Sequence, residues 1–415
     1  VQTLKYYYPK LESGFIYSGS LLHTYFSAFS IKIFKDLIFA SRLISVIFGI
    51  LSIIITFYLT KEIYNKKIGI IAALFVALSS IEIAWSRQAR MYTQLQFFFL
   101  LSLYLFYKFN NSRNLKYFYL VLISTLATIL SHGLGFSLIL IYLLYLILNY
   151  KDFKFLFEKK FIIPIVLFAI PVIYFVIGSL INYKYIYVNY FLKYIYFLRF
   201  NHEILFYFSL IGVIVSLKEF KRSSFLFVSF FTPILILSFF IILLHYRYLF
   251  FILPILFIFA AYLIEFISNY FKKFSYLVVI LLTVIILLQG FSFIPKDNYE
   301  LEPLTPQPNF KEAYLFIKEK YNGEIIIDSY PVLSNIYLGK ADYGLKFSLT
   351  GRDIDIFNET VDVYTNKPFI KLDELRNIKG CYLIIDDLAM GRIDDDLRDY
   401  IKKMNSVNDF NNLYL

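Results

Sequence analysis

The chain has 415 residues, of which 59% are hydrophobic and 17% are charged. A soluble domain of this length cannot bury so much apolar surface, so the composition excludes a water-soluble globular protein. One cysteine, Cys381, excludes an intrachain disulfide framework, and the net charge of +11 suits contact with anionic lipid and gives no reason to expect a nucleic acid partner. We therefore predict a polytopic α-helical membrane protein.

The first segment, residues 1–35, is predicted to be an outer loop with an interfacial helix. The chain begins with Val1, not Met. We expect that it lacks its true N-terminus, including one further span upstream.

A transmembrane helical bundle is predicted over residues 36–294. A helix needs about 17 to 25 mostly apolar residues to cross the hydrocarbon core. About ten runs are long enough or nearly so, and they centre on 38–60, 68–84, 95–109, 115–131, 134–149, 161–181, 203–217, 225–244, 248–267 and 274–294.

The loops between these runs fall into two alternating sets with unequal charge. One set, comprising 61–67, 108–116, 151–160, 218–222 and 272–273, contains 15 Lys and Arg residues. The other set, comprising 85–94, 131–133, 182–202 and 245–248, contains 6. The positive-inside rule makes the first set cytoplasmic, so the second set and the C-terminal part are expected on the outer face of the cell membrane.

The stretch "WSRQARMYTQ" places Arg87 and Arg90 on the face where cations are normally avoided. Snorkelling anchors at a span end are one interpretation. The spacing of Arg87, Arg90 and Gln94 instead predicts one helical stripe with Tyr92 close by, on which two guanidinium groups bind a phosphate. We favour phosphate binding.

Two further outward turns carry candidate ligand-binding residues. "SHGLG" places His132 beside small residues that leave room for a ligand, although a solvated loop histidine is an equal alternative. "HYRYLFFILP" places Arg247 and Tyr248 at the mouth of a span, either as interfacial anchors or as phosphate-binding partners of the first two arginines. No metal site is predicted, because His23, His132, His202 and His245 lack metal-ligand spacing and paired carboxylates. No cofactor is predicted either.

The loop over 182–203 is rich in Tyr and Phe with spaced Lys and Arg. An amphipathic helix in the outer interface explains this pattern as a structural belt. A lid that guides an isoprenoid chain into the bundle is the alternative.

The tail over 295–415 changes character after prolines at 295, 303, 306 and 308. Helices are predicted at 310–321 and 394–405, and strands at 324–328 and 381–387. This alternation predicts a small extracytoplasmic α/β domain. Its acids at strand ends are interpreted mainly as solvated surface residues.

The membrane part resembles the GT-C fold glycosyltransferases that use lipid-phosphate sugars, in particular the group related to protein O-mannosyltransferases and aminoarabinose transferases. The resemblance rests on 41–107, with weaker support from 127–144 and 245–265. It implies transfer of a sugar from a polyprenyl (dolichyl-type) phosphate to a lipid, glycan or protein acceptor on the outer face, with inversion and without a metal. Arg87, Arg90 and Arg247 would hold the carrier phosphate.

The resemblance also implies a carboxylate base in the first outer loop, commonly within an acidic pair. Here Glu12 is the only acid before Asp36, and a solvated loop glutamate is its simpler interpretation. We expect the catalytic acid to lie upstream of Val1.

Two other classes of function compete with a transferase. A transporter or flippase of lipid-linked sugars would also use arginines for phosphate, but it predicts polar groups deep within the spans, and few are seen. A structural membrane component with an outward binding domain leaves the clustering of Arg87, Arg90, His132 and Arg247 unexplained.

Overall fold

The computed structural model describes residues 20–181, 188–201, 203–241, 244–288, 309–346, 361–362, 365–378, 380–391, 393–403 and 413–414. The chain divides into two compact units, one within Gly19–Pro303 and one within Leu304–Leu415. Each unit is described separately. Glu12 and His202 lie outside the described residues.

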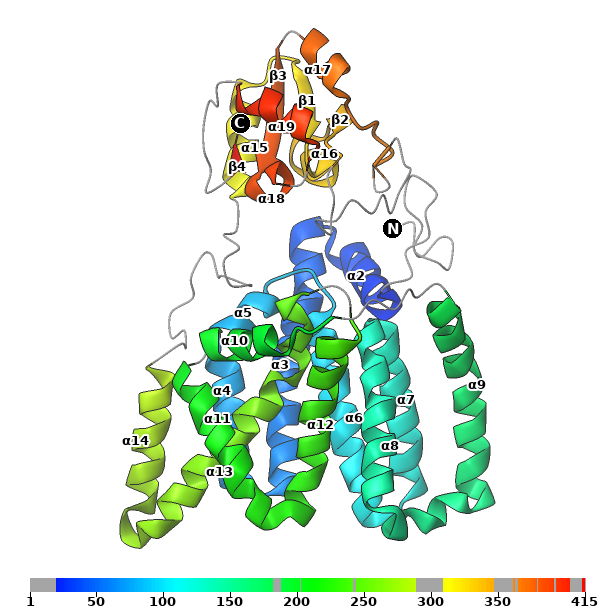
Figure 1. The fold of residues 1–415 in the computed structure, drawn as a ribbon, viewed down its shortest axis with the longest axis vertical. Helices are drawn as coiled ribbons and strands as arrows, with labels where there is room; N and C mark the ends of the chain where they lie inside the picture. Colours follow the sequence, from blue (N-terminus) through cyan, green and yellow to red (C-terminus); the bar gives the residue numbers. More distant parts are fainter. Residues whose placement is uncertain are drawn as a thin grey trace. The chain divides into compact units, whose positions relative to one another are not determined.

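The first unit is a helical bundle (Figure 1). Each of the ten predicted apolar runs contains a helix, and short helices lie between them. The α-helices are α2 (Leu21–Phe34), α3 (Leu37–Ile63), α4 (Lys66–Leu78), α5 (Ser80–Ser86), α6 (Tyr92–Ser112), α7 (Leu115–Ser131), α8 (Ser137–Leu148), α9 (Lys159–Ile181), α10 (Phe191–Asn201), α11 (Glu203–Ser216), α12 (Phe220–Phe239), α13 (Leu253–Tyr270) and α14 (Ser275–Leu287). The 3₁₀ helices are η1 (Gly133–Phe136), η2 (Tyr150–Phe157), η3 (Leu217–Glu219), η4 (Tyr246–Ile252) and η5 (Lys272–Phe274).

Three helical segments in the described residues are long and apolar enough to cross a membrane. They are Leu37–Ile63, Glu203–Phe239 and Tyr246–Tyr270, with mean hydropathies of 2.4, 1.6 and 2.5. A fourth candidate consists of Gly133–Leu148 and Tyr150–Leu156, which are bent by 114° relative to each other. The predicted helix in the aromatic loop is also present as α10. It buries Tyr194 and Phe197 against the bundle and exposes Leu192.

Side chains at helix starts explain where several helices begin. Asp36 accepts the N–H of Phe39 at 2.9 Å at the start of α3, and Asn65 accepts the N–H of Ile68 at 3.0 Å at the start of α4. These caps satisfy N–H groups that have no partner within the helix. The helix starts are therefore fixed by local sequence.

Glycines set the closest helix contacts in the bundle. A Cβ at Gly212 of α11 would lie 2.1 Å from the carbonyl oxygen of Phe259 of α13. A Cβ at Gly49 of α3 would lie 2.3 Å from Oγ of Ser86 at the end of α5. Small residues let helix backbones approach in this way, which strengthens packing in lipid.

The second unit contains a four-stranded sheet with strand order β2-β1-β3-β4. Strand β1 pairs in parallel with β2 and β3, and β3 pairs antiparallel with β4. The elements are α15 (Phe310–Lys320), β1 (Ile325–Asp328), α16 (Pro331–Leu338), β2 (Tyr343–Gly344), α17 (Leu372–Asn377), β3 (Cys381–Asp386), α18 (Asp387–Met390), α19 (Asp395–Lys402) and β4 (Leu413–Tyr414). The predicted helices and strands of this region are confirmed to within a few residues.

Both faces of this sheet are covered. Ile326 and Ile384 pack with α15, whereas Ile327 and Ile385 pack with α19, as alternation along a strand requires. The expectation that acids at strand ends are mainly solvated is wrong for Asp328 and Asp386, which are 0% and 5% exposed. Both carboxyl groups are buried because nearby hydroxyl and N–H donors satisfy them.

Asp328 accepts hydrogen bonds from the hydroxyl groups of Tyr314 and Ser334 and, at 2.8 Å, from the N–H of Tyr330. Burial raises the pKa of Asp328 to about 6, against the opposing effect of these donors. Burial also raises the pKa of Asp386, which accepts the N–H of Ala389 at 2.8 Å and the hydroxyl of Tyr330 at 3.2 Å. Asp328 is therefore the polar centre of this unit.

Candidate active site

Arg87 and Arg90 lie in the turn between α5 and α6, and both are exposed. Arg87 follows the last residue of α5, and the N–H of Arg90 donates to the carbonyl of Gln88 at 2.8 Å. The hydroxyl of Ser45 on α3 donates to the carbonyl of Arg90 at 3.0 Å, which holds the turn against the bundle. Both guanidinium groups are thus carried by a turn that is anchored through its backbone.

The prediction that Arg87, Arg90 and Gln94 share one helical stripe is wrong. The chain leaves helical geometry at residues 87–91, so a spacing of three or four no longer places side chains on one face. Gln94 is fully buried in α6, where its Oε1 accepts from Nδ1 of His23 at 3.2 Å and its Nε2 donates to Oγ of Ser131 at 3.1 Å. It ties α6 to α2 and α7.

Tyr92 begins α6 and belongs to a series of contacting rings. Its ring centroid lies 4.7 Å from that of Trp85 and 5.7 Å from that of His132. His132 lies 5.8 Å from Tyr248, which also contacts His245 at 5.2 Å. Three of the predicted site residues, from segments far apart in sequence, are therefore in contact.

Arg247 lies next to this series, with its guanidinium carbon 6.0 Å from the centroid of the Tyr248 ring. His132 is held in place because its Nδ1 accepts the N–H of Leu134 at 3.1 Å. In the neutral ring this bond places the proton on Nε2, which can then donate. The structure brings Tyr92, His132, Arg247 and Tyr248 together; Arg87 and Arg90 lie on the adjoining turn.

A cavity of about 370 Å³ opens beside His132 and Tyr248. Its other walls are mostly apolar and come from η1, α8, α12 and η4, including Leu134, Phe136, Leu140, Ile236, Leu237 and Phe251. Gly133 also lines it, and a Cβ at this position would meet no atom within 4 Å. The expectation that small residues near His132 leave room for a ligand is consistent with this cavity.

One buried acid near the site was missed by sequence reasoning. Glu82 of α5 is 4% exposed, and its Oε1 accepts a hydrogen bond from Nε2 of Gln96 on α6 at 2.9 Å. The same amide nitrogen donates to the carbonyl of Phe250 on η4 at 3.0 Å. An acid inside an apolar run was the available signal, since such a residue is costly unless it is satisfied.

This Glu82–Gln96–Phe250 connection links three elements. Helix α5 leads into the turn with Arg87 and Arg90, α6 begins with Tyr92, and η4 contains Arg247 and Tyr248. Within the described residues, no three His, Cys, Asp or Glu side chains form a group suited to a metal ion. The groups gathered at this end are arginines, the imidazoles of His132 and His245, tyrosines and an apolar cavity.

The family model described as dolichyl-phosphate-mannose-protein mannosyltransferase matches residues 18–178. This segment includes Arg87, Arg90, Tyr92 and His132, whereas Arg247 and Tyr248 lie outside it. A search of curated proteins found no significant match.

Solved membrane transferases share the fold. ArnT from Cupriavidus metallidurans in the apo state has a TM-score of 0.50 at 11% identity, covering 63% of this chain and 52% of that one. The Archaeoglobus fulgidus oligosaccharyltransferase tethered with an acceptor peptide has a TM-score of 0.54 at 15% identity, covering 95% and 64%. AglB from Archaeoglobus fulgidus in complex with an inhibitory peptide and a dolichol-phosphate has a TM-score of 0.51 at 15% identity, covering 91% and 62%.

The chain spans about half to two thirds of the length of these structures. Identities of this size establish shared architecture and leave donor and acceptor open. The resemblance predicted from sequence is confirmed: the chain has the GT-C fold and resembles the glycosyltransferases of the mannosyltransferase and ArnT group.

Proposed function

We propose that this protein is a membrane glycosyltransferase that moves a sugar from a polyprenyl (dolichyl-type) phosphate to a lipid, glycan or protein acceptor on the outer face of the membrane. The observation that carries the proposal is that His132 and Tyr248 line a mostly apolar cavity of about 370 Å³, with Arg247 beside the Tyr248 ring. Arg87 and Arg90 lie on the turn that leads to Tyr92, whose ring contacts His132. An amphipathic donor needs both an apolar surface for its chain and cations for its phosphate. The AglB structure, whose complex contains a dolichol-phosphate, supports this class of ligand.

In the proposed reaction the bond between the sugar carbon and the phosphate oxygen breaks, and the carrier phosphate leaves with the electron pair. A hydroxyl or amide group of the acceptor forms the new bond to the same carbon and loses its proton to a carboxylate base. Arg87, Arg90 and Arg247 stabilise the charge that develops on the leaving phosphate. Glu82 is not offered as this base, because it is 4% exposed and its carboxylate accepts a hydrogen bond from Gln96.

The proposal includes the orientation of the protein in the membrane. About ten spans within residues 36–294 form the bundle, and the α/β domain within 295–415 lies on the outer face of the cell membrane. The unequal charge of the two loop sets supports this topology.

The test is a transfer assay with membranes that contain the full protein and a radiolabelled polyprenyl-phosphate sugar. The change Arg87→Ala with Arg90→Ala is expected to lower the transfer rate by about 100-fold or more, as loss of a donor to a developing anion does. Arg199→Ala is the matched control, because Arg199 is an exposed arginine on α10 that pairs with Glu203 at 3.0 Å. An unchanged rate in the double variant would contradict the assigned role.

The transporter alternative predicts a different product. A transporter would move the intact labelled lipid across a sealed vesicle and leave the bond between sugar and phosphate unbroken. Movement of intact donor without any transferred sugar, when acceptor is present, would replace the transferase proposal.

A further inference from the structure

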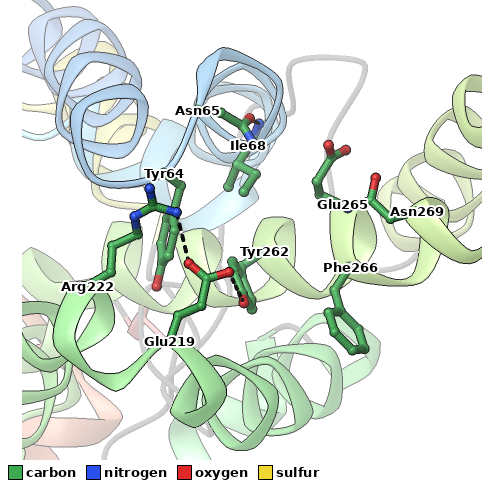
Figure 2. Close-up of a pocket in the computed structure, with 9 residues that line it drawn as sticks. All are labelled: Tyr64, Asn65, Ile68, Glu219, Arg222, Tyr262, Glu265, Phe266 and Asn269. Atoms are coloured by element: carbon green, nitrogen blue, oxygen red, sulfur yellow. Dashed lines mark hydrogen bonds and ion pairs between the residues drawn. The ribbon is translucent and has the colours of Figure 1, made fainter.

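A second pocket lies at the opposite end of the bundle from the candidate active site (Figure 2). Ser45 of α3 contacts the turn with Arg90, whereas Tyr64 at the other end of α3 lines this pocket. At 1.5 Å per residue, these two positions are roughly 28 Å apart along the helix axis. The pocket is therefore separate from the site described above.

The pocket is formed where several helices end or begin. Tyr64 follows α3, Glu219 and Arg222 lie around the start of α12, and Glu265 and Asn269 are near the end of α13. Two of the apolar segments long enough to span a membrane, Leu37–Ile63 and Tyr246–Tyr270, end here. Because the ends of spanning helices lie at the level of the lipid headgroups, we expect headgroups beside this pocket.

One wall of the pocket is an ion pair that faces outward. Nη1 of Arg222 lies 2.9 Å from Oε2 of Glu219, and the hydroxyl of Tyr262 donates to Oε1 of Glu219 at 3.2 Å. The Arg222 side chain is 54% exposed. Its guanidinium can therefore contact a further anion without breaking this pair.

Glu265 forms the inner wall and lacks a short bond to a cation. It is 7% exposed; Lys67 Nζ lies 3.7 Å from its Oε1, and the Ser268 hydroxyl is 3.4 Å from its Oε2. Charge-assisted N–H···O bonds are usually about 2.7 to 2.9 Å long. In the described part of the chain no other Lys, Arg or His lies within 4.0 Å of this carboxylate, so it can accept a closer cationic donor from a ligand.

The size and walls of the pocket restrict that donor. Its volume is about 100 Å³, compared with about 150 Å³ for a cavity that holds the six carbons of benzene. A group of about four heavy atoms fits. The rings of Tyr64 and Tyr262, which are tilted by 39° with centroids 4.8 Å apart, and the ring of Phe266 favour an organic cation over a bare ion.

We propose that this pocket binds a membrane phospholipid whose headgroup carries a primary ammonium on a two-carbon arm, as in an ethanolamine headgroup. The ammonium lies against Glu265 and the tyrosine rings, and the lipid phosphate lies against Arg222 and Lys67, which are exposed beside the pocket. Two carboxylates and two cations complement a zwitterion. A trimethylated choline headgroup has three more carbon atoms and is expected to fit this volume less well.

The experiment measures lipid retention by the full chain with native mass spectrometry. Phosphatidylethanolamine is offered in competition with phosphatidylcholine and phosphatidylglycerol. One molecule of phosphatidylethanolamine is expected to be retained, at least about tenfold in preference to each of the others. Equal retention of phosphatidylcholine would overturn the proposal.

Two variants and one control locate the binding. Glu265→Gln keeps the side-chain size and removes the charge, and it is expected to lower retention about tenfold; Arg222→Gln, at an exposed position, is expected to lower it several-fold. Glu62→Gln is the matched control, since Glu62 is a glutamate at the same end that pairs with Lys108 at 2.7 Å outside the pocket. Unchanged retention in both pocket variants would refute the site.

Soluble phosphoethanolamine has the same charged groups and is tested in a separate competition experiment. It is expected to displace the retained lipid only at a large excess, because the acyl chains of the lipid add contact with the bundle. Binding as tight as that of the lipid would overturn the lipid assignment in favour of a soluble amine. None of these outcomes depends on glycosyl transfer.

Discussion

Each of the two compact units buries an acid, and the hydrogen-bond donors to its carboxylate differ between the units. Asp328 in the α/β unit has three donors, which come from α15, from α16 and from the residue that precedes α16. Glu82 in the bundle has one amide donor, Gln96, which is shared with the backbone of η4. The first arrangement stabilises a small fold, whereas the second connects segments that contain the candidate active site.

The number and origin of its hydrogen-bond donors indicate the role of a buried acid. A carboxylate surrounded by several short-range donors belongs to the core of its own unit. A carboxylate with a single shared donor connects separate elements. Its loss is therefore expected to shift neighbouring residues more than it lowers the free energy of unfolding. The predictions below test that distinction.

Asp328→Ala is expected to have the largest effect on stability. It leaves the hydroxyl groups of Tyr314 and Ser334 and the N–H of Tyr330 without their buried acceptor, at a cost of about 4 kcal/mol in the free energy of unfolding of this unit. Hydrogen exchange on the full chain measures it as faster exchange of β1 and β3, with α3 and α13 unchanged. Equal loss of protection in α3 would contradict the independence of the two units.

The pH dependence of the α/β unit is expected to have an unusual sign. Because the pKa of Asp328 is raised from 3.8 to about 6, the folded unit binds its proton more tightly than the unfolded chain does. The resulting stability is present below about pH 4 and is lost as pH rises through 6, amounting to at most about 3 kcal/mol. The raised pKa of Asp386 acts in the same direction.

Exchange protection of β1 measured between pH 4 and 7, after correction for the intrinsic rate, tests this dependence. Asp328→Asn keeps an acceptor but cannot titrate, so most of the pH dependence should disappear in that variant. Stability that instead rises through this range would show that the pKa of Asp328 is lowered.

Gln96→Leu is expected to cost about 2 kcal/mol, because it removes the donor to Glu82 and to the Phe250 carbonyl while it preserves volume. The distinguishing result is local: amide exchange should become faster in η4 than in the rest of the bundle. Glu82→Gln is the matched variant, since its amide oxygen still accepts from Gln96, and it should leave η4 exchange nearly unchanged. Uniform loss of protection across the bundle in Gln96→Leu would show a general packing role.

Hydropathy patterns located most of the helices and strands. The run predicted at 115–131 coincides with α7, and the strand predicted at 324–328 corresponds to β1. These elements depend on local sequence, through apolar composition, Asn or Asp caps and a glycine turn at Gly323.

The site was only partly predictable, for physical reasons. His132 and Tyr248 were both predicted to bind substrate, which stays a prediction, and both line one cavity because turns on one side of a bundle converge. The stripe of Arg87 with Gln94 was wrong, because nothing in the spacing reveals that residues 87–91 form a turn. Gln96 was missed because one of its partners is the backbone carbonyl of Phe250, which is 154 positions away and leaves no mark in residue type.

Pro233 of α12 gives the cavity wall a mechanical property. Proline has no N–H, so α12 lacks one rung of its helical ladder at the point where Pro233 lines the cavity. By contrast, the close backbone approach at Gly212 fixes the spacing of α11 and α13. Of these three helices, α12 is therefore the one expected to bend most easily, at the wall of the cavity.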